Sequence, residues 1–116
     1  MKIKKWAAPN EQMCIIGRHQ WSLPRLLELA RDLPVMEIPI DHLNVYQIYE
    51  KLTLRDMVMH MNAAIGADLN YPIILDEDGE ILDGRHRIMK AMLNEIPVIK
   101  AVRFEENPSP CRVVDE

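Results

Sequence analysis

The chain has 116 residues, of which 48% are hydrophobic and 28% are charged, a balance typical of one globular domain with a single modest core. No apolar run approaches the roughly 20 residues that cross a bilayer, and no apolar stretch of the signal-peptide kind follows the basic start. The net charge of −4 argues against a protein that coats nucleic acid through its overall field. We expect a cytoplasmic protein in which Cys14 and Cys111 are free thiols.

The first part of the chain predicts a short strand and one helix. Residues 13–16 have the composition of a strand. Ser22 is a typical helix N-cap, and Pro34 stops the helix that follows. We expect Trp21 to pack against this helix. Its apolar residues recur at helical spacing, namely Leu23, Leu26, Leu27, Ala30 and Leu33.

The middle of the chain predicts a strand and a capped helix. Residues 35–40 alternate as a strand does, and Pro39 favours a place at the edge of a sheet. The secondary structure of residues 41–52 is ambiguous from the sequence, and a short helical turn at 45–49 is one option. Thr53 then begins a helix with a capping box that Asp56 closes. We expect this helix to bury one apolar face and to end at Gly66; the face consists of Leu54, Met57, Val58, Met61 and Ile65.

The remainder predicts a strand pair, a helix and a last strand. Residues 72–82 hold two apolar segments on either side of a turn at 78–79. A helix follows from Arg85, and residues 97–104 form the last strand, with an irregular tail after it. This mixed order of elements predicts an α+β domain with a small mixed sheet and packed helices. The expected core face of the last helix is Ile88, Met89, Met92, Leu93 and Ile96.

The turn before this last helix is the most distinctive feature of the chain. Residues 84–87 read Gly-Arg-His-Arg, which places cationic side chains beside free backbone N–H groups at the positive end of a helix dipole. Arginine binds phosphate bidentately and keeps its charge at any working pH. A phosphate-bearing ligand, either a nucleotide or a nucleic-acid backbone, would fit such a turn. The expected phosphate-binding residues are Asp83, Gly84, Arg85, His86, Arg87 and Lys90.

Two of these residues have more than one interpretation. Gly84 either lets a phosphate approach the backbone closely or simply forms the turn before the helix. Asp83 could orient the arginines, ligate a divalent ion bound to the phosphate, or accept backbone N–H groups as a turn residue.

The order of the elements, together with Gly-x-His-Arg at residues 84–87, resembles the ParB/sulfiredoxin superfamily over residues 35–104. In ParB-like domains the corresponding turn holds nucleotide phosphates, and in sulfiredoxins it cradles ATP. The resemblance implies a ParB/sulfiredoxin-like core at 35–116 behind an N-terminal extension at 1–34 with one helix. It also implies ATP or CTP as the ligand, with Mg²⁺ bound to the nucleotide. Stand-alone domains of this sort are frequent in phages and mobile elements.

The chain also departs from both branches of this superfamily. Arg85 stands where sulfiredoxins carry their reactive cysteine, and neither Cys14 nor Cys111 replaces it by motif. Reduction of a sulfinic acid is therefore excluded. No helix-turn-helix or dimerisation domain follows Arg103, so we do not expect a complete partition protein.

Chemistry beyond binding would require a carboxylate that activates a water or hydroxyl group, or that holds Mg²⁺. Glu37 and Asp41 bracket the predicted strand at 35–40, and Glu50 lies in the following loop. In superfamily members that act as free-serine kinases, an acidic residue near this region resembles a catalytic base. Glu37, Asp41 and Glu50 are therefore the candidate catalytic residues, and no protein metal site is predicted.

Three functions follow from these observations. The first is a domain that binds ATP or CTP, with slow hydrolysis or phosphoryl transfer as an added option. The second is a DNA-binding module or metal-dependent ParB-like nuclease that grips a backbone phosphate with the same turn. The third is an interaction protein that keeps the fold and has lost the ligand. The expected partners are a nucleotide, DNA as the alternative, and a second copy of the chain in a homodimer, without a membrane.

Overall fold

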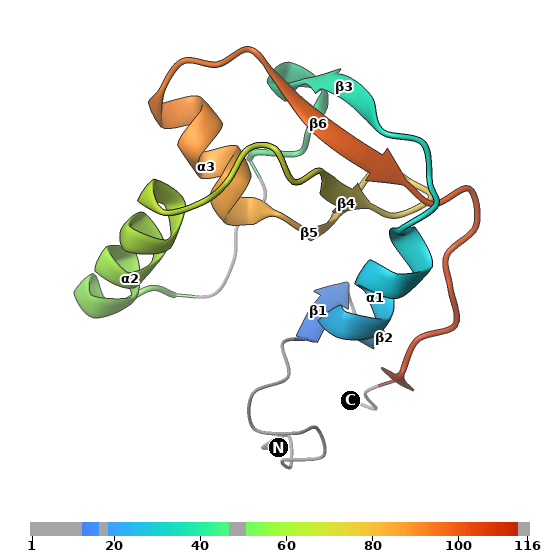
Figure 1. Cartoon of the computed structure of the whole chain (residues 1–116). Coiled ribbons are helices and arrows are strands. Elements are labelled where there is room, and N and C mark those ends of the chain that lie inside the picture. The colour runs from blue at the N-terminus through green and yellow to red at the C-terminus, as the bar shows by residue number, and fades with distance from the viewer. Residues whose placement is uncertain (1–12, 17–18, 47–50, 114–116) are drawn as a thin grey trace.

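The computed structural model describes residues 13–16, 19–46 and 51–113 (Figure 1). Its larger sheet has four strands in the spatial order β3-β6-β4-β5. β6 runs parallel to β4, whereas the other neighbours are antiparallel, so the predicted α+β class with a small mixed sheet is confirmed. The strand that contains Pro39 lies at an edge, as predicted. The strands are β3 (Met36–Pro39), β4 (Ile73–Leu75), β5 (Ile81–Asp83) and β6 (Val98–Arg103).

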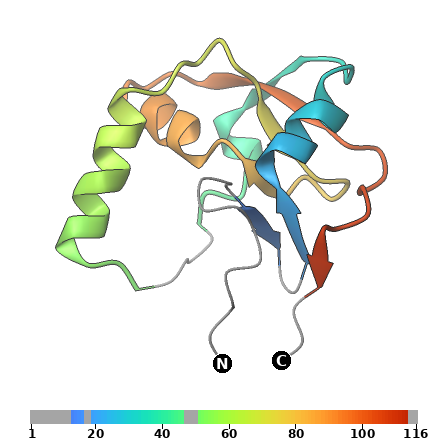
Figure 2. The same ribbon diagram turned by 60° about the horizontal axis from the view of Figure 1, so that its bottom comes forward.

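A smaller sheet joins the two ends of the described chain. It consists of β1 (Met13–Ile16), β2 (His19–Ser22) and β7 (Arg112–Val113), with β2 in the centre (Figure 2). The strand at 13–16 is confirmed. The prediction of an irregular tail is correct only as far as residue 111, because residues 112–113 form β7, which pairs with β2. A two-residue strand has too little pattern to be recognised in a sequence, and here its position is set by backbone pairing.

The helices begin largely where the sequence places their caps. α1 (Leu23–Ala30) begins after Ser22, whose Oγ accepts a hydrogen bond from the Arg25 N–H at 3.3 Å. α2 (Leu54–Ile65) begins with the predicted capping box, in which Thr53 and Asp56 exchange hydrogen bonds of 3.0 and 3.1 Å. α3 (Arg85–Leu93) is followed by Glu95 at a φ of 55°, so it ends before Ile96. A short 3-10 helix, η1 (Ile40–His42), follows β3.

The hairpin between β4 and β5 is closed by a buried carboxylate. Asp76 Oδ1 accepts hydrogen bonds from the backbone N–H groups of Asp78 and Glu80, each at 2.8 Å. Gly79 has a φ of 84°, a conformation that glycine adopts at little cost. Asp76, the first residue of the acidic turn, thus fixes its conformation. The turn in turn sets where β5 begins.

Two apolar clusters cover the two faces of the larger sheet. On one face α3 contributes Ile88 and Ala91, and on the other α1 packs together with Trp21, as predicted. Successive side chains of a strand point to opposite faces, so Ile73 joins the α3 cluster and Ile74 the α1 cluster. The domain therefore has the sheet between α1 and α3.

α2 does not contribute to this core, and the predicted burial of its apolar face is wrong. Of its twelve residues Ala64 alone is buried. The helix lies at the periphery against α3 and away from the sheet in both views (Figures 1 and 2). Met92 and Leu93 of α3, also predicted to be buried, are exposed as well. The expected face is exposed to different degrees: Leu54 82%, Met57 47%, Val58 55%, Met61 51% and Ile65 66%.

Candidate functional site

The Gly84–Arg87 turn borders a cleft of about 1630 Å³. Residues of α1, α2, the edge strand β5 and the first turn of α3 line this cleft. Most lining side chains are apolar. The charged ones comprise three arginines and three acidic residues, so their formal charges cancel. The cleft as a whole therefore does not select an anion, and any selection has to come from the local arrangement at the turn. The charged lining residues are Arg31, Asp68, Glu80, Asp83, Arg85 and Arg87.

Gly84 is required by the fold itself. Its φ of 115° is a conformation that side chains with a Cβ rarely adopt. A Cβ added at this position would lie 2.4 Å from Ile73 Cγ2 and 2.7 Å from Ile73 Cβ. Of the two interpretations of this glycine, the turn-forming one therefore accounts for it fully, because β5 and α3 meet directly over Ile73.

Arg87 and Asp83 form an ion pair that fastens α3 to the sheet. Arg87 Nη2 lies 2.7 Å from Asp83 Oδ2, and about one fifth of each side chain is exposed. Arg87 Nη1 also donates to the carbonyl oxygens of Pro72 at 2.8 Å and Tyr71 at 3.2 Å. Asp83 thus orients an arginine, as one of its three interpretations proposed. Arg87 is held by these three acceptors, so a phosphate would have to compete with them.

Lys90 has a similar internal role. Its Nζ donates to the carbonyl oxygen of Ala67 at 2.6 Å and so ties α3 to the segment after α2. It is not among the residues that line the cleft. The structure therefore separates Lys90 from the turn residues with which the sequence grouped it.

His86 lies against His60, a residue that sequence reasoning did not place at the site. His60 Nδ1 and His86 Nε2 are 2.9 Å apart, a hydrogen bond that requires at least one neutral ring. Burial, followed by electrostatic repulsion between the His60 and His86 rings, lowers the pKa of His86 below its ordinary value of 6.5, while Asp83 opposes this shift. The sequence carries no local signal for this contact, because His60 lies on another helix and the burial of Ala64, four residues later, is known only from the fold.

Arg85 is the other arginine of the turn that lines the cleft. Its side chain is partly buried and lines the cleft. Its Nη2 donates to the Ile81 carbonyl oxygen at 3.4 Å, a longer hydrogen bond than any that Arg87 makes. Arg85 therefore combines a contact to β5 with a place on the cleft wall.

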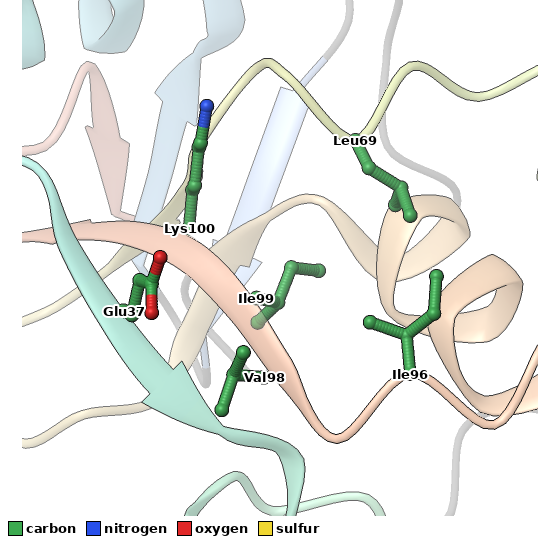
Figure 3. Close-up of a pocket in the computed structure, with 6 residues that line it drawn as sticks. All are labelled: Glu37, Leu69, Ile96, Val98, Ile99 and Lys100. Atoms are coloured by element: carbon green, nitrogen blue, oxygen red, sulfur yellow. The ribbon is translucent and has the colours of Figure 1, made fainter.

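The candidate catalytic acids lie elsewhere. Glu37 of β3 pairs with Lys100 of β6 and borders a separate cavity of about 150 Å³ (Figure 3). Leu69 and Ile96 point toward one another in that cavity, which is smaller than the roughly 300–1,000 Å³ of ordinary ligand pockets. Asp41 is exposed in η1, whose Ile40 N–H donates to Pro97 beyond the far end of α3.

Neither Glu37 nor Asp41 lines the cleft, and Glu50 lies outside the described residues. Within residues 13–16, 19–46 and 51–113, no group of three or more His, Cys, Asp or Glu side chains is arranged to hold a metal ion. The part of the chain that the structure describes also contains no helix with the length and apolar character needed to span a membrane.

Cys111 is an exposed free thiol, as expected. Its Sγ accepts hydrogen bonds from the Ser22 N–H at 3.4 Å and from Arg25 Nη1 at 3.5 Å. The Ser22 hydrogen bond is the main reason that the pKa of Cys111 lies below its ordinary value, and Arg25 adds to the effect. The thiol is far along the chain from the Gly84–Arg87 turn and is not among the residues that line the cleft.

Comparison of the chain with family models, with curated proteins and with solved structures finds no match. The resemblance to the ParB/sulfiredoxin superfamily therefore stays a prediction.

Proposed function

We propose that the cleft binds a nucleotide, ATP or CTP, with its phosphates at the first turn of α3 and with Arg85 as the principal cation. The observation that supports this is the position of Arg85 and His86, which line a large cleft at the start of a nine-residue helix. The N-terminal end of a helix attracts phosphate through its N–H groups and its dipole. Sugar and base would lie on the apolar lining, and Mg²⁺ would be carried by the phosphate oxygens.

In this proposal the residues of the motif divide into two groups. Arg85 binds the phosphate, and His86 lies beside it with its ring oriented by His60. Arg87, Asp83 and Lys90 keep the helix in place through the contacts they already make. The proposal is one of binding only, since Glu37 and Asp41 stand outside the cleft.

Calorimetric titration with ATP, CTP, GTP and ADP in the presence of Mg²⁺ tests the proposal. Arg85→Ala should weaken nucleotide binding about ten- to a hundred-fold, because a hydrogen bond to a charged group contributes about 1.5–3 kcal/mol. Arg31→Ala is the matched control, since it removes the same charge from the same cleft at the end of α1, away from the turn. Its effect should be much smaller, and circular dichroism should show both variants folded.

Two results would contradict the proposal. One is the absence of saturable binding of any of the four nucleotides to the wild-type chain. The other is an equal loss in the Arg85→Ala and Arg31→Ala variants, which would reduce the effect to general electrostatic attraction. Arg87→Ala is unsuitable for this experiment because the Arg87 side chain holds the fold.

One observation favours the DNA-binding module or nuclease as the second candidate. The cleft is larger than ordinary small-molecule pockets and has room for an extended ligand. The net charge of −4 weighs against it. Single-stranded DNA that binds with a salt dependence of about 0.7 per phosphate on a log–log plot, without competition from mononucleotides, would favour this candidate. Cleavage of that DNA with Mg²⁺ would add the nuclease activity.

A further inference from the structure

α2 carries an apolar stripe that no described residue covers. The stripe consists of Leu54, Val58, Met61 and Ile65, and each of these side chains is more than half exposed. Helices of this length are marginal in water on their own and gain most of their stability when an apolar face is packed. α2 buries Ala64 alone. A second apolar surface packed on the stripe would therefore stabilise α2.

The exposed apolar area is a large part of the apolar area that a standard interface buries. Met57 extends the α2 stripe on its own helix, and Leu93 lies on the face of α3 that meets α2, seven residues after His86. If each large apolar side chain carries on the order of 100 Å² of apolar surface, the six exposed fractions amount to roughly 350 Å². A standard interface buries about 800 Å² per partner, of which about 480 Å² is apolar. The patch thus supplies most of the apolar part.

We propose that the α2 stripe packs antiparallel against the α2 stripe of a second copy of this chain across a two-fold axis. The spacing of the four residues is 4-3-4, which reads the same from either end of the helix. A two-fold axis at the middle of α2 sets Leu54 against Ile65 and Val58 against Met61. Every apolar residue of one stripe then meets an apolar residue of the other, which is the condition for an isologous interface.

Charge and shape also suit this pairing. Arg55 is the one arginine of α2, and at a rise of about 1.5 Å per residue the two copies of Arg55 would lie about 13 Å apart along the helix axes. That separation exceeds the screening length of about 8 Å at physiological salt, so repulsion is weak. Met61 can adapt its shape to the opposing side chain. Leu54, Val58 and Ile65 do not line the cleft, whereas Met57 and Met61 do, so the interface would border the cleft on its α2 side.

Sedimentation of the full chain across a micromolar concentration series, without nucleotide, tests the proposal. The wild type should have twice the monomer mass, and Val58→Lys should be monomeric. Met59→Lys is the matched control, because Met59 is as exposed as the stripe but lies about 100° around the helix from Val58. It should remain dimeric, and circular dichroism should show both variants folded. A monomeric wild type, or equal effects of the two lysines, would overturn the proposal.

A complementary pair of variants tests the antiparallel register. Val58→Glu and Met61→Lys should each be monomeric, because each sets a charge against an apolar residue of the second copy. An equimolar mixture of the two should form a dimer, in which the new carboxylate at position 58 faces the new ammonium at position 61. A mixture that stays monomeric would contradict this register. Arg85→Ala should leave the wild-type dimer intact, so the outcome is independent of nucleotide binding.

Discussion

α2 and α3 have similar apolar patterns in the sequence and opposite surroundings in the structure. α3 sets Ile88 and Ala91 against the sheet and directs its first turn toward the cleft. α2 sets Ala64 against α3 and leaves its main apolar stripe exposed. The periodicity of a helix therefore indicates that an apolar face exists, but it does not tell what covers that face. The faces of this sheet are covered by α1 and α3, so α2 is left to pack on a neighbouring helix.

Glycine substitutions at the two helices should show the difference most strongly. Gly84→Ala at the start of α3 should lower the free energy of unfolding by about 3 kcal/mol, because it adds backbone strain and a clash with Ile73. Gly66→Ala at the end of α2 should change it by less than about 1 kcal/mol and raise it if anything, since Gly66 has a φ of −83° and its nearest neighbour would be 3.6 Å away. Urea unfolding measures both.

Gly79→Ala separates the two causes at Gly84. Gly79 also has a positive φ, but a Cβ there would meet nothing within 4 Å. Gly79→Ala should therefore add backbone strain without a clash and lower the free energy of unfolding by about 1 kcal/mol. Equal losses at positions 79 and 84 would mean that the contact with Ile73 relaxes freely, and that the junction of β5 and α3 is looser than its geometry suggests.

Arginine substitutions should sharpen the same comparison. Arg87→Ala on α3 should lower the free energy of unfolding by about 2 kcal/mol, because it removes charged hydrogen bonds and leaves Asp83 without this cation. Arg55→Ala on α2 should change it by no more than about 0.5 kcal/mol, since Arg55 is exposed. Both are measured by urea unfolding. A double-mutant cycle with Asp83→Asn should show coupling between positions 83 and 87; additive losses would show that the ion pair does not hold α3.

Much of the fold could be predicted because its signals are local. The capping box of Thr53 and Asp56, the N-cap at Ser22 and the edge position of the strand with Pro39 all depend on nearby residues. β7 could not be predicted, because it exists through pairing with β2, some ninety residues away in the chain. The burial of α2 failed for the same reason: what a helix meets is decided by the whole fold.

The candidate site was predicted in its location and only partly in its roles. The sequence located the Gly84–Arg87 turn before a helix, and the structure places this turn on a large cleft. It could not tell that Arg87 makes an ion pair and backbone contacts within the fold. Arg85 and Arg87 are the same residue type in the same motif. Arg87, however, is two residues further along the helix, where its guanidinium reaches the carbonyl oxygens of Tyr71 and Pro72. The partner of His86, on a different helix, had no local signal that pointed to it.

The contact between α2 and α3 should also respond to pH. The pKa of His86 is lowered in the folded chain, mainly by burial, so the unfolded chain binds the proton more readily. The contribution of neutral His86 to the free energy of unfolding is therefore fully present above the ordinary pKa of 6.5. It is lost as the pH falls through the lower pKa of the folded chain. Melting temperatures measured between pH 7.5 and 5 should fall for the wild type.

His86→Gln keeps a polar side chain at this position but does not titrate, so its melting temperature should fall less over the same range. His42→Gln is the control, because His42 is exposed on η1 and away from the cleft, and it should behave as the wild type does. If His86→Gln followed the wild-type curve, the acid sensitivity would have to come from other groups. A flatter curve would locate it at the His60–His86 contact, where α2 meets the first turn of α3. The helix that lies outside the core would then be attached to the cleft by a contact that acid weakens.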